Sequence, residues 1–162
     1  MYGESCRLAS VPESIPSRDE FDGDAPVSFW GVTCINNTAE EDGGVLYAKD
    51  SNMRFEGQAK DNVAKNSGGA FYLAAGTVMI LRGEFRRNRA MEGGAIFGEQ
   101  SAHVRCADCE ISNNHGVSAG GGAAIVAGLN TELPIAFQCD GCTIKNNRAS
   151  VGGIPPSFLH CW

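Results

Sequence analysis

The sequence predicts an all-β fold, a right-handed parallel β-helix of about five coils, and three observations lead to it. An asparagine recurs at near-constant spacing, a glycine pair and an apolar stretch follow each asparagine, and apolar and polar residues alternate ahead of it. Units of roughly 25 residues made of strands and tight turns leave little room for a helix. They favour a β-solenoid over leucine-rich or ankyrin arrays.

Five asparagines anchor the repeat, at successive intervals of 25, 26, 26 and 33 residues. A small residue stands two positions after each anchor, and the glycine pair and the apolar stretch come next. Asparagine tolerates the left-handed backbone region and its amide can bond neighbouring backbone, so we expect the anchors to support one turn in coil after coil. The anchors are Asn37, Asn62, Asn88, Asn114 and Asn147.

The residues before each anchor predict a strand with one buried face. The third and fifth positions before the anchor are small or apolar, whereas the second and fourth are mostly polar. A period of two with one apolar side is typical of a half-buried strand. The third position, expected to point inward, is occupied by Cys34, Ala59, Phe85, Ile111 and Ile144.

The segments outside the regular units predict three regions. Residues 1–26 are expected to form an N-terminal arm or cap, residues 27–154 the repeats, and residues 155–162 a C-terminal cap or tail. The 33-residue interval predicts a surface loop inserted within residues 128–134. Cys6 and Cys161 lie outside the repeat, and a disulfide between them would tether the two ends.

The net charge and the length of the apolar runs argue against nucleic acid as a partner and against a membrane-spanning helix. The net charge of −6 argues against nucleic acid, which favours a basic face. The longest apolar run, within residues 70–81, falls short of the ~20 residues that a membrane-spanning helix requires. Seven cysteines favour a secreted, cell-surface or organelle-lumen location over the cytoplasm, although their odd number and spacing define no disulfide framework.

Two Cys-x-x-Cys pairs form the strongest candidate metal site. Cys106 and Cys109 precede Cys139 and Cys142 by 33 residues each, so the pairs occupy equivalent places in adjacent coils. Residues three apart on a regular strand face opposite sides, and four sulfurs meet only if a turn or bulge intervenes. Free thiols stacked in the core, disulfides between coils and a zinc site all remain open, and stacked thiols or disulfides fit the strand geometry better than zinc does.

Charged residues in the third coil allow two interpretations. One is a site for an anionic partner, and the other is a solvated surface balanced by acidic neighbours. The basic residues are Arg82, Arg86, Arg87 and Arg89, with Lys60, Lys65 and Lys145 in other coils. A polysaccharide lyase or hydrolase would need clustered carboxylates for calcium or acid–base work, and Glu84 and Glu110 share a column one coil apart, as any two polar residues of one column do.

The segment FRRNRAMEGGAIF, residues 85–97, resembles the repeat of the chlamydial polymorphic outer-membrane proteins. That repeat carries a Phe-x-x-Asn core and a Gly-Gly-Ala-Ile core, and the resemblance extends with substitutions over residues 27–154. It implies a pectin-lyase-like right-handed parallel β-helix, used for adhesion or scaffolding rather than for chemistry.

Together these observations favour a non-catalytic structural or protein-interaction module, an accessory subunit of a larger assembly or a fragment of an adhesin-like surface protein. Short solenoids expose unpaired backbone at both coil ends, so we expect a protein partner to cap a coil end or to dock on the arm and tail. The alternative is a carbohydrate-active β-helix. No catalytic residue and no cofactor is assigned, with zinc at the four cysteines as the one candidate.

Overall fold

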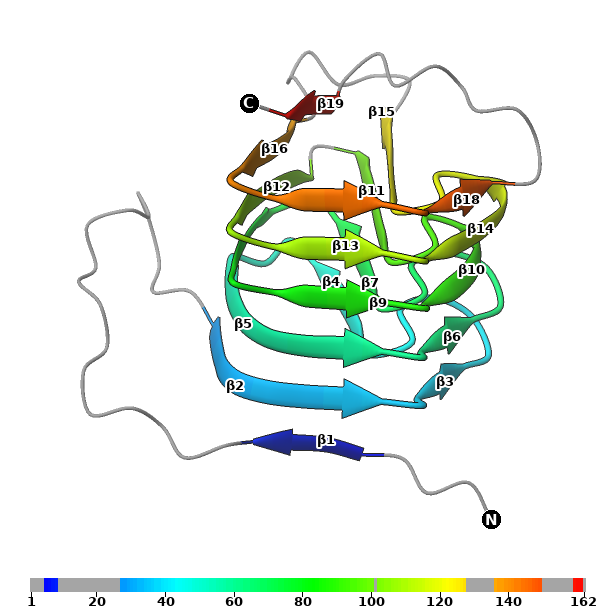
Figure 1. The fold of residues 1–162 in the computed structure, drawn as a ribbon, viewed down its shortest axis with the longest axis horizontal. Helices are drawn as coiled ribbons and strands as arrows, with labels where there is room; N and C mark the ends of the chain where they lie inside the picture. The colour runs from blue at the N-terminus through cyan, green and yellow to red at the C-terminus, as the bar shows by residue number, and fades with distance from the viewer. Residues whose placement is uncertain (1–4, 9–26, 101, 128–135, 150–158, 162) are drawn as a thin grey trace.

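The computed structural model describes residues 5–8, 27–100, 102–127, 136–149 and 159–161, and all its regular elements are strands. The strands wind into a parallel β-helix (Figure 1). Strands on the near side run left to right, the chain returns behind them, and each turn lies above the one before, which makes the helix right-handed. The predicted fold class is therefore confirmed.

The strands form three sheets along the sides of the solenoid. One sheet has five parallel strands: β3 (Thr38–Ala39), β6 (Val63–Ala64), β10 (Arg89–Glu92), β14 (His115–Ala119) and β18 (Arg148–Ala149). A second has four: β4 (Leu46–Lys49), β7 (Phe71–Ala74), β11 (Ile96–Gln100) and β15 (Ala123–Ala127).

The third sheet has ten strands, two of which are β1 (Ser5–Leu8) and β19 (Leu159–Cys161) at its ends. It is continuous because the first coils turn a corner without a break. The long strands β2 (Val27–Ile35) and β5 (Met53–Lys60) cover two sides of the solenoid, which later coils cover with two short strands each. These are β8 (Thr77–Leu81) with β9 (Glu84–Arg86), β12 (His103–Ala107) with β13 (Glu110–Ser112), and β16 (Ala136–Asp140) with β17 (Thr143–Lys145).

The coil count is slightly lower than expected. Four complete coils pass through all sides of the solenoid, and the fifth contributes β16, β17 and β18 but no strand to the four-stranded sheet within the described residues. The loop expected within residues 128–134 and the boundary expected at residue 154 lie outside the described residues.

Matching positions of successive coils lie in register, as the repeat predicts. Phe85 pairs with Ala59 on one side and with Ile111 on the other, and Ile111 pairs with Ile144. Parallel pairing in register places like side chains above one another, so the columns seen in the sequence are columns in space.

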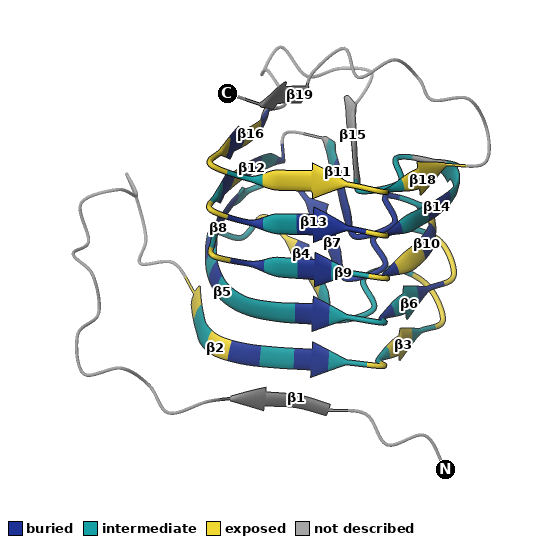
Figure 2. Ribbon diagram, in the orientation of Figure 1, coloured by how far each residue is buried: buried dark blue, intermediate teal, exposed yellow. Residues whose placement is uncertain are grey.

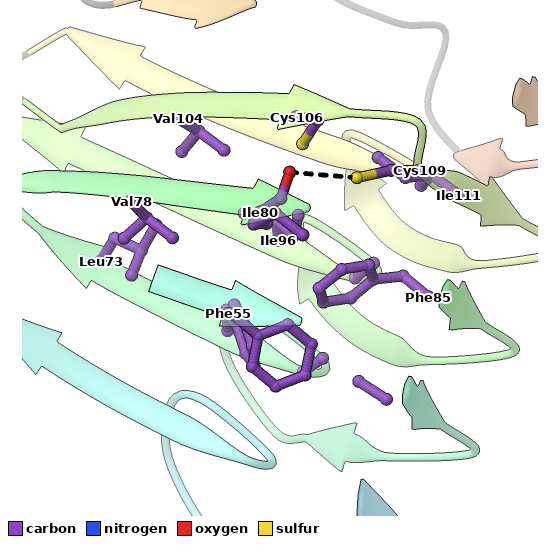
Figure 3. Packing of buried hydrophobic residues seen from close by; sticks show 14 of the residues in the cluster. Phe55, Leu73, Val78, Ile80, Phe85, Ile96, Val104, Cys106, Cys109 and Ile111 are labelled. Carbon is purple, nitrogen blue, oxygen red and sulfur yellow. Dashed lines mark hydrogen bonds between the residues drawn. The ribbon is translucent and has the colours of Figure 1, made fainter. Parts of the chain in front are cut away.

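The core consists of the inward columns (Figures 2 and 3). Phe55, Phe71 and Phe85 pack together with ring centroids 4.8 to 5.8 Å apart, and Ile80, Ile96 and Val104 lie above them. Cys34, Ala59, Phe85 and Ile111 are buried as predicted. Ile144 is the exception at 39% exposure, because no strand of the described part lies beyond it.

The left-handed residue at each asparagine turn is not the anchor, which corrects the expectation. Positive φ angles between 52° and 59° belong to the residue immediately before it: Asn36, Asp61, Arg87, Asn113 and Asn146. The preceding residue turns the chain, and the anchor side chain is thereby directed into the interior, where Asn62, Asn88 and Asn114 are fully buried.

The two glycines of each pair have different roles. Gly68 has a φ of +66°, a conformation that side chains with a Cβ rarely adopt. Gly69 lies so close to the next coil that a Cβ would come within 2.1 Å of the Gly94 carbonyl oxygen. The motif therefore supplies one left-handed turn and one close approach between coils.

The ends of the solenoid are covered unequally. Strand β1 (Ser5–Leu8) pairs antiparallel with β2 and places Cys6 opposite Cys34, whereas β19 (Leu159–Cys161) pairs parallel with β16 and places Cys161 beside Cys139. Because β1 and β19 lie at opposite ends of the stack (Figure 1), the backbone does not favour the disulfide between Cys6 and Cys161 that the sequence left open. Among the described residues there is no helix able to span a membrane.

Candidate functional site

The buried asparagines form a continuous hydrogen-bonded ladder through the solenoid. The Asn88 Oδ1 accepts from the backbone N–H of Asn62 at 3.0 Å and from the Asn62 Nδ2 at 3.0 Å. The Asn88 Nδ2 donates to the Ala59 carbonyl at 2.8 Å and to the Asn114 Oδ1 at 3.0 Å. A buried amide is tolerated when all its hydrogen bonds are made, and each interior rung meets that condition.

The ladder has a direction. In every step the side-chain amide donates toward the C-terminal end, and the last step runs from the Asn114 Nδ2 to the Asn147 Oδ1 at 3.0 Å. Asn147 donates one Nδ2 hydrogen to the Ile111 carbonyl at 2.9 Å. The other Nδ2 hydrogen and the backbone N–H are left as donors at the end of the described ladder.

A second ladder, of charges, runs along the outer face of β9, β13 and β17. The Lys60 Nζ lies 2.7 Å from Glu84, and the Arg86 guanidinium bridges Glu84 at 3.1 Å and Glu110 at 2.9 Å. The Lys145 Nζ lies 3.2 Å from Glu110. Basic and acidic groups thus alternate along one connected chain of ion pairs, and the two candidate carboxylates each have basic partners.

The electrostatics of Glu110 do not suit a general acid. Hydrogen bonds from Arg86, Lys145 and Ser112 lower the pKa of Glu110 to about 2, so its carboxylate is ionised at any ordinary pH. A general acid needs a pKa near the working pH, and Glu110 has been shifted in the opposite direction.

Several other basic residues also have acidic partners one coil below. The Arg82 guanidinium donates to the Glu56 carboxylate through Nε and Nη2, and the Arg87 guanidinium donates to the Asp61 carboxylate at 2.6 and 2.7 Å. Lys65 pairs with Glu40. These contacts match the solvated, balanced surface that was one of the two predicted interpretations.

A short basic column on the five-stranded sheet differs from this pattern. Arg89, His115 and Arg148 occupy one column in three successive coils. Arg89 and Arg148 are exposed, and neither has an ion pair within the described residues. A hollow of about 980 Å³ lies beside the upper end of this column, lined by residues 113–115 and 146–149.

The four candidate metal-binding cysteines come together in the core. The turn that convergence requires is present, because Asp108 has a φ of 54° and Gly141 a φ of 61°. With this turn, the two cysteines of each pair point toward the same side. Cys106, Cys109 and Cys139 are buried, and Cys142 is partly buried.

The thiols use their hydrogen bonds within the protein. The Cys109 Sγ lies 3.3 Å from the Ile80 carbonyl (Figure 3), and the Cys142 Sγ lies 3.4 Å from the Cys106 carbonyl. The hydrogen bond between Cys106 and Cys109 raises the pKa of Cys106 and lowers that of Cys109. Burial raises the pKa of Cys142 to about 12. Thiols with a raised pKa stay protonated at neutral pH.

Cys106, Cys109 and Cys142 are free thiols, so the structure contains no disulfide between Cys109 and Cys142. In the part of the chain that the structure describes, no set of three or more His, Cys, Asp or Glu side chains is arranged to hold a metal. Zinc at Cys106, Cys109, Cys139 and Cys142 stays a prediction. Metal analysis of protein purified without chelator would check it, with about one zinc per chain expected if the site exists.

An aromatic stack on the four-stranded sheet was not foreseen. Tyr47, Tyr72 and Phe97 share a column, with ring centroids 4.8 and 5.5 Å apart and planes within 12° of parallel. Tyr72 and Phe97 are buried, whereas Tyr47 is 55% exposed. The sequence contains a signal for this stack. In three successive repeats the third residue after the glycine pair is aromatic, and the apolar residues of these strands do not alternate with polar ones.

The first coil is the part of the chain that matches a known protein family. Residues 31–49 match the Chlamydia polymorphic membrane protein repeat. The matched segment of this polymorphic membrane protein (PMP) repeat runs from the bend in β2 through Asn37 and the first glycine pair to the end of β4. It covers the first coil, not the third, whose residues carried the resemblance.

Later coils reproduce the geometry of the matched unit in register, so the chain is a PMP-like parallel β-helix. A search of curated proteins and of solved structures gave no match.

Proposed function

We propose that this chain is a non-catalytic structural or protein-interaction module, an accessory subunit of a larger assembly or part of an adhesin-like surface protein. The observation that carries the proposal is the contrast between the sides and the last coil. Along the outer face of β9 and β13 the charges are paired, whereas β17 and β18 each have only one neighbouring strand in the described part and all their residues are exposed. Unpaired strand edges invite pairing with another chain.

The state of the carboxylates supports a non-catalytic role. Glu84 and Glu110 were the best acid–base candidates, and both lie between basic groups that hold them as ion-pair partners. The structural use of these residues accounts for their shared column without any substrate.

Two observations support a surface or secreted location. The matched family is described as a membrane protein of Chlamydia. Cys34 is disulfide-bonded, and disulfides persist mainly in oxidising compartments. Biotinylation of intact native cells with a reagent that does not cross membranes would label the chain if this location is right.

A photo-crosslinking experiment tests the interaction role. A photoreactive amino acid would replace Thr143, exposed in β17, or Arg105, exposed on β12 as the matched control. We expect one dominant protein adduct from position 143 in native cells and none from position 105. Equal adducts from both positions, or none from either, would contradict the proposal.

The carbohydrate-active alternative has one observation in its favour. A hollow of about 260 Å³ lies where β2 and β5 bend, and its lining includes Glu56, Arg82 and Glu84. A glycan array with a reducing-end assay tests it. Binding or cleavage that is lost on Glu84→Gln would favour this alternative over an interaction module.

A further inference from the structure

We infer that the open edge of β17 and β18 in the last coil takes a parallel strand from a partner polypeptide, and that the partner strand carries the sequence apolar-x-x-Asn-acidic. This inference rests on the proposed interaction role and names the chemistry of the partner. Three separate features of the edge, namely its hydrogen-bond donors, its apolar contact and its charge, each specify one position of that sequence.

The asparagine is specified by the ladder. Each interior rung receives two hydrogen bonds on its Oδ1 from the preceding rung, one from a backbone N–H and one from an Nδ2. Asn147 presents the same two donors beyond the last described coil, because its Nδ2 uses only one hydrogen on Ile111. An amide oxygen in the next rung satisfies both donors, as in the four steps below it.

The apolar position, three residues earlier, is specified by Ile144. In the same column Ala59, Phe85 and Ile111 are at most 1% exposed, since a neighbouring coil covers each of them. Ile144 is 39% exposed and lies at the centre of an exposed strand, which Figure 2 shows as the uppermost strand of the near side. An apolar residue stacked on Ile144 removes that surface from water.

The acidic position is specified by Arg148. Several cations of the solenoid are neutralised from the adjacent coil, as Arg87 is by Asp61 and Lys60 by Glu84. Arg148 continues a column that already holds Arg89 and His115, and it has no ion pair within the described residues. A carboxylate directly above Arg148 would pair with it as Asp61 pairs with Arg87 of the adjacent coil, and would relieve this run of basic groups.

A second copy of this chain is a less suitable occupant. The complementary edge of another copy would be the first coil, where β1 already pairs with β2 from Ser5–Ile35 to Leu8–Val32. The first coil also carries Thr38 after its anchor, which offers Arg148 no charge. The edge therefore fits a strand of another chain better than it fits self-association.

Peptides based on the third coil of this chain test the inference. The probe is residues 83–92 with Arg89→Glu, which places Phe85, Asn88 and a carboxylate at the three specified positions. The matched control is the same peptide with Asn88→Ala as well. Binding to the full-length protein would be followed by nuclear magnetic resonance and fluorescence anisotropy.

We expect the probe to shift the backbone and side-chain amide signals of Asn147 and to leave those of Asn88 unchanged. The Asn88→Ala peptide should bind at least about tenfold more weakly, since two donors of Asn147 stay unpaired. In the protein variant Arg148→Glu, the preference should invert, so that the peptide with the original Arg89 binds better than the probe.

Equal binding of both peptides, or no effect of Arg148→Glu, overturns the inference. If the wild-type protein alone self-associates and Ile144→Lys abolishes this, the occupant is a second copy and the inference is also wrong. A crosslinked partner at position 143 without any peptide selectivity would leave the proposed function standing and remove only the strand sequence.

Discussion

Asn88 shows how a polar residue can anchor a hydrophobic solenoid. Its side chain is fully buried, yet the carbonyl oxygen accepts two hydrogen bonds and the amide nitrogen donates two. A hydrogen bond in a folded protein contributes little by itself, but an unsatisfied buried donor is costly. Each asparagine therefore stabilises the solenoid mainly because, without it, buried hydrogen-bond donors of the preceding asparagine would have no acceptor.

Replacing Asn88 by Ala should lower the free energy of unfolding by about 3 kcal/mol or more, because the Asn62 N–H and Nδ2 lose their acceptor. Urea unfolding followed by circular dichroism measures the change. Asn66→Ala is the control, since Asn66 is exposed and bonds its neighbours through backbone, and it should change stability by less than about 0.5 kcal/mol. Similar losses for both variants would show that the ladder is dispensable.

Glu110 makes stability depend on acid pH. Its pKa falls from 4.5 to about 2 in the folded protein, so the ion pairs stabilise the fold above the unfolded pKa and are lost as the pH falls from about 4.5 toward 2. Unfolding measured across this window should show a shallower decline for Glu110→Gln than for the wild type. The exposed Glu41→Gln serves as control, and an unchanged slope in Glu110→Gln would contradict the assignment.

At the level of residues, the sequence predicted columns better than it predicted contacts. Phe85 and Ile111 were correctly placed inside, because alternation and spacing are visible in one dimension. The left-handed residue was assigned to the anchor instead of to the residue before it, since Asn is common at positive φ and the spacing alone does not separate the two. The partners of Glu84 required register between coils and side-chain reach, which spacing suggests but does not fix.

Among the elements, the glycine turns set how closely coils can stack. Gly69 has backbone of the neighbouring coil on the side where a Cβ would be, including the Arg89 nitrogen at 2.6 Å. Backbone cannot move aside as a flexible side chain can. The glycine pair was visible in the sequence. That the first glycine is required for its backbone conformation and the second for the close approach of the coils is clear only from the structure.

Gly69→Ala should therefore cost about 3 kcal/mol or more of unfolding free energy, through strain between coils. Gly122→Ala is the matched comparison, because a Cβ there would come no closer than 3.1 Å, to side-chain atoms of Asn147 and Ile111, so a shift of a few tenths of an ångström would relieve the contact. Thermal unfolding should show a much smaller effect for Gly122→Ala. Equal effects of the two substitutions would mean that close approach to backbone is not what requires glycine at position 69.

On the scale of the whole molecule, the two ends of the solenoid differ. At the N-terminal end β1 covers the edge of β2, and Cys34 of β2 is disulfide-bonded. At the C-terminal end β17 and β18 have no second neighbour in the described part. The sequence suggested that both tails could cap the solenoid, but the antiparallel direction of β1 follows from long-range pairing that no repeat column encodes.

Removal of the N-terminal residues that include β1 should change how the protein associates. Deletion of residues 1–26 exposes the hydrogen-bonding edge of β2, including the core position Cys34, which is only 1% exposed in the intact chain. We expect the truncated protein to associate as its concentration rises, which sedimentation velocity would detect. The deletion should be made with Cys34→Ser, so that a free thiol does not link the chains.

Full-length Cys34→Ser separates the strand from the disulfide. It retains β1 and should stay monomeric, while its unfolding free energy falls by about 2–4 kcal/mol from the lost crosslink. A monomeric truncated protein as stable as full-length Cys34→Ser would show that β1 does not act as a cap. Association of the truncated form alone would mean that pairing with β1, rather than the disulfide, is what protects the first coil.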